Sequence, residues 1–318
     1  MGNTRPDAAY EAATAFGTFG ELLQGALSDG TDFLVTMPIA RWSTARFRYD
    51  PHAPDVRVRP ASRVKSKLLA EALLAGHGLP GGGLLHLHSD LPVGKGLASS
   101  SADLVATARA VARAVGVAAD PATIEALIRP IEPSDGVMYP GSVAFHHRQV
   151  RLRARLGHLP PMTVVGVDEG GEIETVGFNR RPKDFSDHDK HVYEHLLDVL
   201  GTAIREGDAA TVGQVATHSA RMNQRLCPKR LLDDMIAVCR DVQGLGVVAA
   251  HSGTVLGVLL DAAAPDHAWQ LERARKAAAE LTGTAWVDHT LPGGDGEPKA
   301  LRCPGAGWCT AEMAQAQV

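Results

Sequence analysis

The stretch Pro92-Val-Gly-Lys-Gly-Leu-Ala-Ser-Ser-Ser-Ala-Asp103 decides the fold. Its two glycines carry no Cβ, so the backbone can turn tightly and approach a ligand closely. Upstream, Leu84 to His88 has the composition of a strand, and apolar residues recur at helical spacing from Leu104 to Val115. The first N–H groups of such a helix lack partners within it, and the helix dipole favours an anion there. The order strand, glycine-rich loop, helix therefore predicts a phosphate site.

The spacing of this loop excludes two common phosphate motifs. Lys95 is followed by Gly96 and not by a hydroxyl residue, as the Walker motif requires, and the dinucleotide fingerprint would need glycine where Ser99 stands. The pattern Pro-x-x-x-Gly-Leu-x-Ser-Ser does fit, and it resembles the nucleotide loop of the GHMP kinases. A helix cap without a ligand is the alternative. The resemblance implies an ATP-binding loop at 92–103 whose binding residues are Pro92, Gly94, Lys95, Gly96, Leu97, Ala98, Ser99, Ser100 and Ser101.

The bulk composition indicates a soluble protein with a small ligand. The chain has 318 residues, 45% of them hydrophobic, and a net charge of −4, which allows a substantial core. Because no basic cluster is present, a nucleic-acid partner is not expected. No run of 18 apolar residues and no signal peptide are found, so we expect a cytoplasmic protein without a membrane partner. The sequence leaves open whether the chain forms a homodimer.

The order of predicted elements indicates an α+β fold. Strands are expected between Thr14 and Arg59 and a helix from Ser66 to Ala75, whereas apolar strands and helices alternate beyond residue 160. We expect two lobes, at 1–158 and 159–318. The resemblance implies the two-lobed GHMP kinase fold, with a left-handed β-α-β unit in the N-terminal lobe and an α/β sandwich as the C-terminal lobe.

Five motifs together resemble one subgroup of these kinases, the L-threonine kinases linked to cobalamin side-chain synthesis and propanediol utilisation. The motifs lie at residues 17–25, 92–100, 132–135, 167–171 and 250–254. The resemblance implies transfer of the γ-phosphoryl group of Mg-ATP to the side-chain hydroxyl of L-threonine. Two alternatives stay open: a kinase of the same fold acting on serine, homoserine or a related hydroxy compound, and a homologue that binds a metabolite for regulation without catalysis.

Two acidic residues are candidates for the chemistry. Asp135, in Pro133-Ser-Asp-Gly136, lies in a loop that resembles the one with the family's catalytic aspartate, with a spacing one or two residues shorter. A carboxylate at this place can accept the proton of the alcohol; an Asx-turn is the alternative reading. Glu21 matches the acidic residue of the family's Gly-Glu-His motif, with Leu22 in place of the histidine. Together with Gln24, it is assigned to the substrate site, although a hairpin with a surface Glu would give the same pattern.

Magnesium would be held by a hydroxyl and a carboxylate. The resemblance assigns the hydroxyl to Ser100 and the carboxylate to Glu125 or Glu132, and the choice between the two stays open. Lys95 is a candidate catalytic residue because its ammonium could reach a phosphate, but a loop lysine that points to water is the alternative.

Two further segments are candidates for substrate binding. After the strand at 162–167, the carboxylate of Asp168 could face an ammonium group and Thr175 a carboxylate, whereas a tight hairpin is the alternative. A turn at 249–257 takes the place of the third glycine-rich element of the family. It contributes Ser252, Gly253 and Thr254.

Overall fold

The computed structural model describes residues 9–171 and 185–291. Strands occupy β1 (Glu11–Ala26), β2 (Asp32–Asp50), β3 (Val56–Arg59), β4 (Gly82–Ser89), β5 (Ser142–His146), β6 (Arg151–Gly157), β7 (Met162–Asp168), β8 (Gly246–Ala249), β9 (Val255–Asp261) and β10 (Trp286–His289). Helices occupy α1 (Val64–Gly76), α2 (Ser99–Val115), α3 (Pro121–Ile128), α5 (Asp187–Glu206), α6 (Ala209–Asn223), α7 (Leu232–Asp241) and α8 (His267–Thr282). The mixture confirms the α+β prediction.

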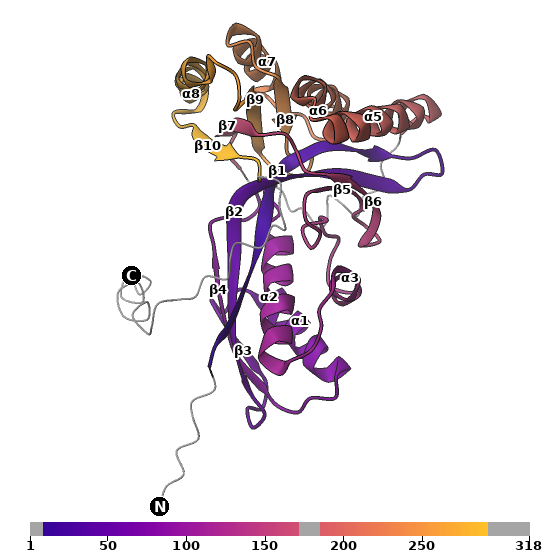
Figure 1. The fold of residues 1–318 in the computed structure, drawn as a ribbon, viewed down its shortest axis with the longest axis vertical. Coiled ribbons are helices and arrows are strands. Elements are labelled where there is room, and N and C mark those ends of the chain that lie inside the picture. Colours follow the sequence, from indigo (N-terminus) through magenta and orange to yellow (C-terminus); the bar gives the residue numbers. More distant parts are fainter. Residues whose placement is uncertain (1–8, 172–184, 292–318) are drawn as a thin grey trace, which may run out of the picture.

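One 10-stranded sheet connects these elements, in the order β10-β7-β9-β8-β1-β2-β4-β3, with β5 on β2 and β6 on β5. β1 and β2 are its longest strands and pair antiparallel over nearly their whole length. In Figure 1 they run from the region of β3 and β4 to the region of α5 and α6. β3 and β4 pair in parallel and are joined by α1, which forms a β-α-β unit.

Helix α2 fills the centre of the N-terminal half. It packs on β1, β2 and α1, and residues from Ser99 to Ala112 are buried along most of its length. Gly116, with φ of +70°, ends the helix in the left-handed conformation that glycine adopts without strain. The buried position explains the dense run of alanine and valine, whose small side chains let the helix lie close to the sheet.

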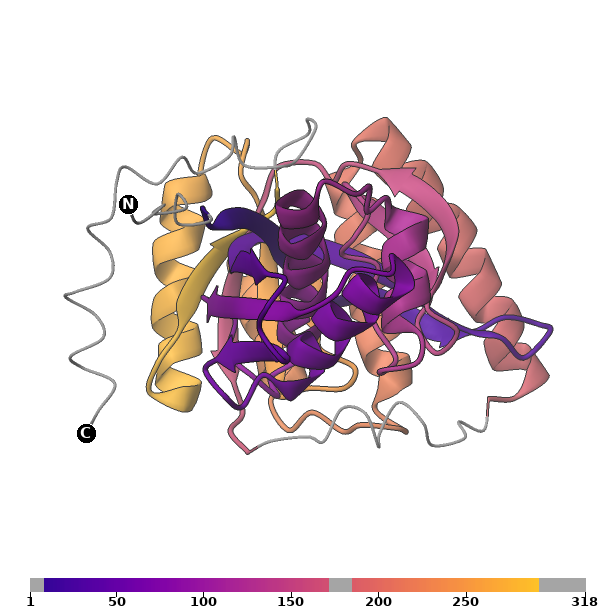
Figure 2. The ribbon, with the colours of Figure 1, turned by 90° about the horizontal axis from the view of Figure 1, so that it is seen from below.

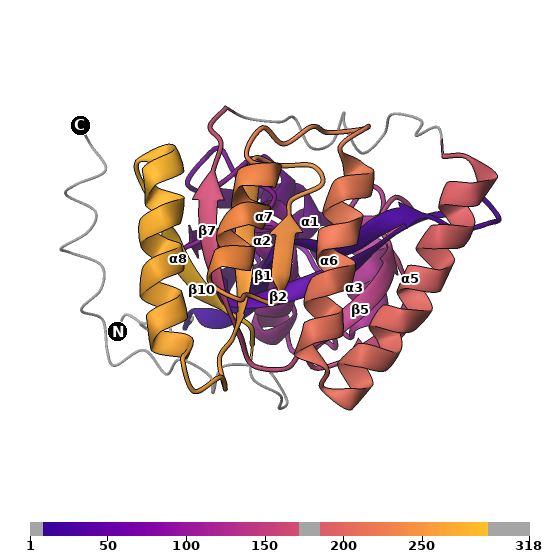
Figure 3. The same cartoon turned by 90° about the horizontal axis from the view of Figure 1, so that it is seen from above.

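The C-terminal helices form a row on the part of the sheet that contains β7, β9 and β8. Figure 3 shows α8, α7, α6 and α5 in this order across the molecule, and α8 and α5 also lie on opposite sides in the view from below in Figure 2. α6 packs on β8 and β1, whereas α7 and α8 pack on β9 and β7. In the described part of the chain, no helix combines the length and apolar character needed to cross a bilayer.

Strand β1 is irregular where it meets β8. Its pairing with β2 changes register on both sides of Glu21, and Glu21 and Ala249 form the β1–β8 pair. Such irregularities turn a side chain out of its regular direction. They occur at the residue that the sequence assigns to the substrate site.

Most elements predicted from periodicity are found within one or two residues, and α5 begins and ends as expected. The helix expected from Lys229 to Val242 begins later, at Leu232. The hairpin of β5 and β6 was not predicted. The division into lobes at residue 158 stays a prediction.

Candidate active site

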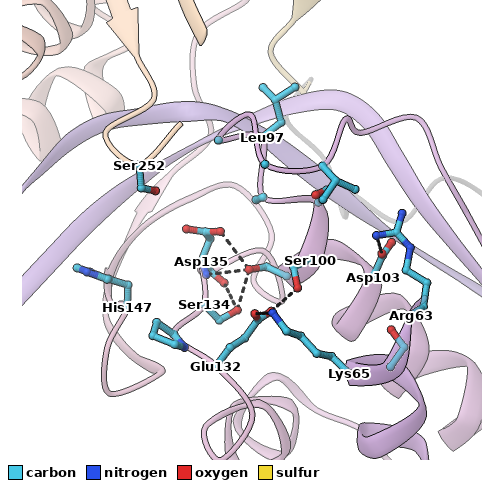
Figure 4. Close-up of a pocket in the computed structure, with 18 of the residues that line it drawn as sticks. Arg63, Lys65, Leu97, Ser100, Asp103, Glu132, Ser134, Asp135, His147 and Ser252 are labelled. Carbon is cyan, nitrogen blue, oxygen red and sulfur yellow. Dashed lines mark hydrogen bonds and ion pairs between the residues drawn. The ribbon is translucent and has the colours of Figure 1, made fainter. Parts of the chain in front are cut away.

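A cavity of about 690 Å³ lies between the start of α1, the phosphate loop and the segment after α3. Its walls come from residues 62–66, from residues of the stretch 93–103 and from residues 132–135. Glu21, His147 and Ser252 complete them. Figure 4 shows that polar side chains of these segments converge on one space. The structure therefore brings three segments and three further residues that are distant in sequence to a single polar site.

Three glycines fix the phosphate loop between β1 and the turn after β8. A Cβ on Gly20 would lie 2.7 Å from Ala249 O, one on Gly96 2.3 Å from Ala250 Cβ, and one on Gly253 2.1 Å from Lys95 O. Backbone hydrogen bonds join the same segments, including Gly20 N to Gly96 O at 3.1 Å. Gly20, Gly96 and Gly253 are therefore the points at which the phosphate loop contacts β1 and the turn after β8, and we call these three contacts the glycine clamp.

The start of α2 is open to an anion. Its N-cap, Ala98, has a φ of 57° and a side chain without any hydrogen-bonding group, so no side chain caps the helix. The first backbone bond of the helix runs from Ala102 N to Ala98 O. The N–H groups of Ser99 to Ser101 therefore have no partner within the helix, and these residues line the cavity. This geometry suits a phosphate group.

Asp135 is held beside this helix start by two serines. Ser101 Oγ donates to Asp135 Oδ2 at 3.0 Å and accepts from Asp135 N at 3.2 Å. Ser134 Oγ donates to Ser101 Oγ at 3.0 Å. Burial and then the charge of Glu21 raise the pKa of Asp135 to about 7, although the Ser101 hydrogen bond opposes them. A carboxylate that titrates near neutrality is suited to accept a proton.

Ser100 and Glu132 both line this cavity and are joined by a hydrogen bond. Ser100 Oγ donates to Glu132 Oε1, and Lys65 Nζ forms an ion pair with Glu132 Oε2. Glu125 lies elsewhere: its Oε1 accepts from Tyr139 Oη at 2.9 Å and from the backbone N–H of Leu152 at 2.7 Å, and it does not line the cavity. The proposal of Glu125 as a metal ligand is therefore corrected, because its carboxylate joins α3 to the neighbouring elements.

The residues around Ser100 fit a magnesium ion. Magnesium takes one or two carboxylates, keeps several waters and binds the substrate's phosphates, and Glu132 with the Ser100 hydroxyl supplies such a donor pair. Among the described residues, no group of three or more His, Cys, Asp or Glu could hold a metal by itself. A site shared with the phosphates of ATP needs no such group.

Two basic side chains at the start of α1 belong to the cavity and were missed by sequence reasoning. Lys65 contacts Glu132, and Arg63 binds Asp103 Oδ2 at 3.1 Å. Asp103 also accepts from Ser43 Oγ at 2.5 Å. Burial raises the pKa of Asp103 against the influence of Ser43 and Arg63. Only the packing of α1 against α2 reveals that these charges face the phosphate loop.

Lys95 points away from this cavity. Its Nζ lies 2.8 Å from Asp168 Oδ2 and 2.6 Å from Gly171 O, and Thr254 Oγ1 donates to Asp168 Oδ1 at 2.6 Å. Burial alone would raise the pKa of Asp168, but the Lys95 and Thr254 hydrogen bonds outweigh it and lower that pKa. Neither Lys95, Asp168 nor Thr254 lines the cavity. The three side chains instead tie the phosphate loop to β7 and to the turn at 250–254.

The remaining candidates are divided between the cavity and its surroundings. Glu21 and Ser252 line it, and Gly253 contacts the phosphate loop from outside. Gln24 is buried in β1 and does not line the cavity. Thr175 lies outside the described residues.

Comparison with known proteins finds a family match and two sequence relatives. Residues 63–141 match the GHMP kinases N terminal domain. L-threonine kinases of Salmonella typhimurium and Citrobacter freundii are each 28% identical to the chain; they cover 76% of it, and the matches span 80% and 83% of the relatives.

Solved structures show the same fold. Mevalonate kinase of L. major superposes with a TM-score of 0.67 at 16% identity, covering 91% of this chain and 98% of that one. Homoserine kinase of Cytophaga hutchinsonii gives a TM-score of 0.68 at 13% identity, covering 92% and 97%. The region that matches the GHMP kinases N terminal domain contains the phosphate loop, Glu132 and Asp135, and the chain is a small-molecule kinase.

Proposed function

We propose that this kinase phosphorylates the side-chain hydroxyl of L-threonine with ATP and releases O-phospho-L-threonine and ADP. The observation that carries the proposal is the position of Asp135 beside the uncapped start of α2 in one cavity. The helix start accounts for the phosphate donor, and the carboxylate accounts for an alcohol acceptor. The choice of threonine is supported by the names of the two sequence relatives.

In this mechanism, the N–H groups of Ser99 to Ser101 bind phosphate oxygens of ATP. Asp135 Oδ takes the hydroxyl proton while the threonine oxygen bonds to the γ-phosphorus and the bond from that phosphorus to the bridging oxygen of ADP breaks. Positioning and charge neutralisation supply most of the rate enhancement in phosphoryl transfer. Lys65 adds a positive charge beside Glu132 in the wall of the cavity.

Ser100 and Glu132 would hold magnesium, which would neutralise charge on the phosphates when bound. Lys95 is proposed to assist from the edge of the phosphate loop. Its ammonium reaches the phosphates only if it leaves Asp168, which it contacts at 2.8 Å. Glu21 and Ser252, from the neighbouring segments β1 and the turn after β8, are proposed to contact the acceptor.

The test compares acceptors under identical conditions. The purified chain is supplied with Mg-ATP and L-threonine, L-serine, L-homoserine, a sugar alcohol or no acceptor, and ADP release is followed together with the phosphorus NMR spectrum of the product. We expect the highest kcat/KM for L-threonine and a phosphomonoester signal only when an acceptor is present. A higher kcat/KM for another alcohol would transfer the assignment to that compound. ADP release that stays at the level without protein for every acceptor would indicate a binding protein without kinase activity.

A further inference from the structure

A buried chain of hydrogen bonds runs from the cavity to α6. The backbone N–H of His251 donates to Glu21 Oε2 at 2.9 Å, and His251 Nδ1 lies 3.2 Å from the same oxygen. On the other side of the ring, Nε2 lies 2.8 Å from Ser219 Oγ. The exposed fractions of Glu21, His251 and Ser219 are 5%, 1% and 0%. Of the three residues, only Glu21 lines the cavity.

The surroundings of the ring select one tautomer of His251. The backbone N–H of Gln24 donates to Ser219 Oγ at 3.3 Å, which leaves the hydroxyl proton of Ser219 available for donation to Nε2. The ring proton then belongs on Nδ1, which faces two acceptors, Glu21 Oε2 at 3.2 Å and Ala249 O at 3.1 Å. A hydrogen bond on one ring nitrogen fixes the role of the other in this way.

The two carboxylate oxygens of Glu21 differ in their hydrogen bonds. Both donors from His251 bind Oε2, and no side chain or backbone group in the described ranges is bonded to Oε1. The carboxylate borders the cavity and acts on Asp135, since its charge raises the pKa of that group. One oxygen is therefore fixed, and the other is available to a positively charged group on a ligand between Glu21 and Asp135.

We propose that His251, oriented by Ser219, is the positioning residue that fixes Glu21 as the acceptor for the ammonium group of the amino-acid substrate. The inference rests on the proposed function, because only an amino-acid acceptor carries that ammonium. It adds two residues from the C-terminal half of the chain, His251 and Ser219, to the determinants of specificity. An ion pair shielded from water gains strength from the low local dielectric, so a displaced Glu21 should cost affinity for the acceptor in particular.

Two substitutions of the same histidine separate positioning from packing. The amide of His251→Asn can place an N–H near the position of Nδ1, whereas the longer side chain of His251→Gln places it near Nε2. We expect His251→Gln to raise KM for L-threonine about tenfold or more, as for a lost hydrogen bond to a charged group. KM for ATP should change little, and His251→Asn should restore much of the affinity. Equal losses for both variants, or parallel changes in both KM values, would overturn the proposal.

A double-mutant cycle with Glu21→Gln tests whether His251 acts through Glu21. In the Glu21→Gln background, His251→Gln should add little to KM for L-threonine. With 3-hydroxybutanoate, which lacks the ammonium group, wild type and His251→Gln should have similar KM values. Independent, additive effects of the two substitutions on KM would contradict the proposal that His251 acts through Glu21.

The tautomer can be measured without any substrate. Nitrogen NMR of the ¹⁵N-histidine-labelled full chain, with the His251→Asn spectrum for assignment, should show the ring proton of His251 on Nδ1. A ring protonated at Nε2 would refute the inference. If wild type phosphorylates an acceptor without an ammonium group in preference to threonine, the proposed function and the ammonium assignment fail. The NMR result, which needs no substrate, then reports on the contact between His251 and Glu21 alone.

Discussion

The substitution Asp135→Asn keeps the size of this side chain and an oxygen for the Ser101 hydroxyl, but it removes the site that would take up the substrate proton. Loss of a general base lowers rates by about 10²- to 10⁴-fold. We therefore expect kcat for threonine phosphorylation to fall within this range while ATP binding is largely preserved. In wild type, kcat/KM should fall as the pH drops through about 7, because protonated Asp135 cannot accept a proton.

The same substitution should stabilise the fold at high pH. The pKa of Asp135 rises from 3.8 in the unfolded chain to about 7 in the folded one, so folding disfavours the charged form. Below pH 3.8 the group is protonated in both states and costs nothing. The cost grows as the pH rises and is complete above about 7. At 1.36 kcal/mol per unit, its upper limit is about 4 kcal/mol, or about 2 kcal/mol with allowance for solvent in the cavity.

Two measurements check this prediction. ADP release between pH 5.5 and 9 locates the acidic limb of kcat/KM, and urea unfolding at pH 5 and pH 8 measures the free energy of unfolding of both proteins. The stability gain of Asp135→Asn should be larger at pH 8. Asp103→Asn, which removes another carboxylate of the cavity, is the control and should keep the acidic limb. A rate for Asp135→Asn within a few-fold of wild type would refute the assignment of the base.

Three further predictions concern the phosphate loop and the metal. Gly96→Ala should lower both Tm and ATP affinity because its Cβ would lie 2.3 Å from the Cβ of Ala250. The control Gly116→Ala, also at positive φ but in open space, should lower Tm alone. Equal ATP affinities of the two variants would contradict the role of the glycine clamp. Glu132→Gln should raise the Mg²⁺ concentration for half-maximal rate, and Glu125→Gln should not; a titration with the reverse result would restore Glu125 as the ligand. Lys95→Met should raise KM for ATP several-fold more than KM for threonine, and a larger effect on threonine would exclude contact with phosphate.

Local sequence patterns were sufficient to predict most of the helices and strands. α5 begins after Ser186, whose side chain forms a capping box with Asp189, and ends before Gly207; both signals lie within a few residues of the helix end that they fix. The β5–β6 hairpin escaped prediction, although the alternation of exposed arginines at 151, 153 and 155 was a usable signal. The completely buried β5 offers no such alternation.

The choice between Glu125 and Glu132 shows where sequence reasoning ended. The two residues are close in the chain, but α3 ends at Ile128 between them. Glu125 therefore faces Tyr139, and Glu132 lies in the segment that reaches Ser100. Their directions depend on how α3 packs, which periodicity does not encode.

By itself the sequence determined the phosphate loop, the α+β class and the candidate base, because glycine spacing, helix starts and hydrophobic periods are local properties of the chain. Only the tertiary structure decided that Lys65 joins Glu132, that Lys95 turns to Asp168 and that His251 holds Glu21. These contacts join residues from 67 to 230 positions apart. They exist because the β1–β8 pair and the glycine clamp bring distant segments together, and the free energy of that packing is distributed over the whole core.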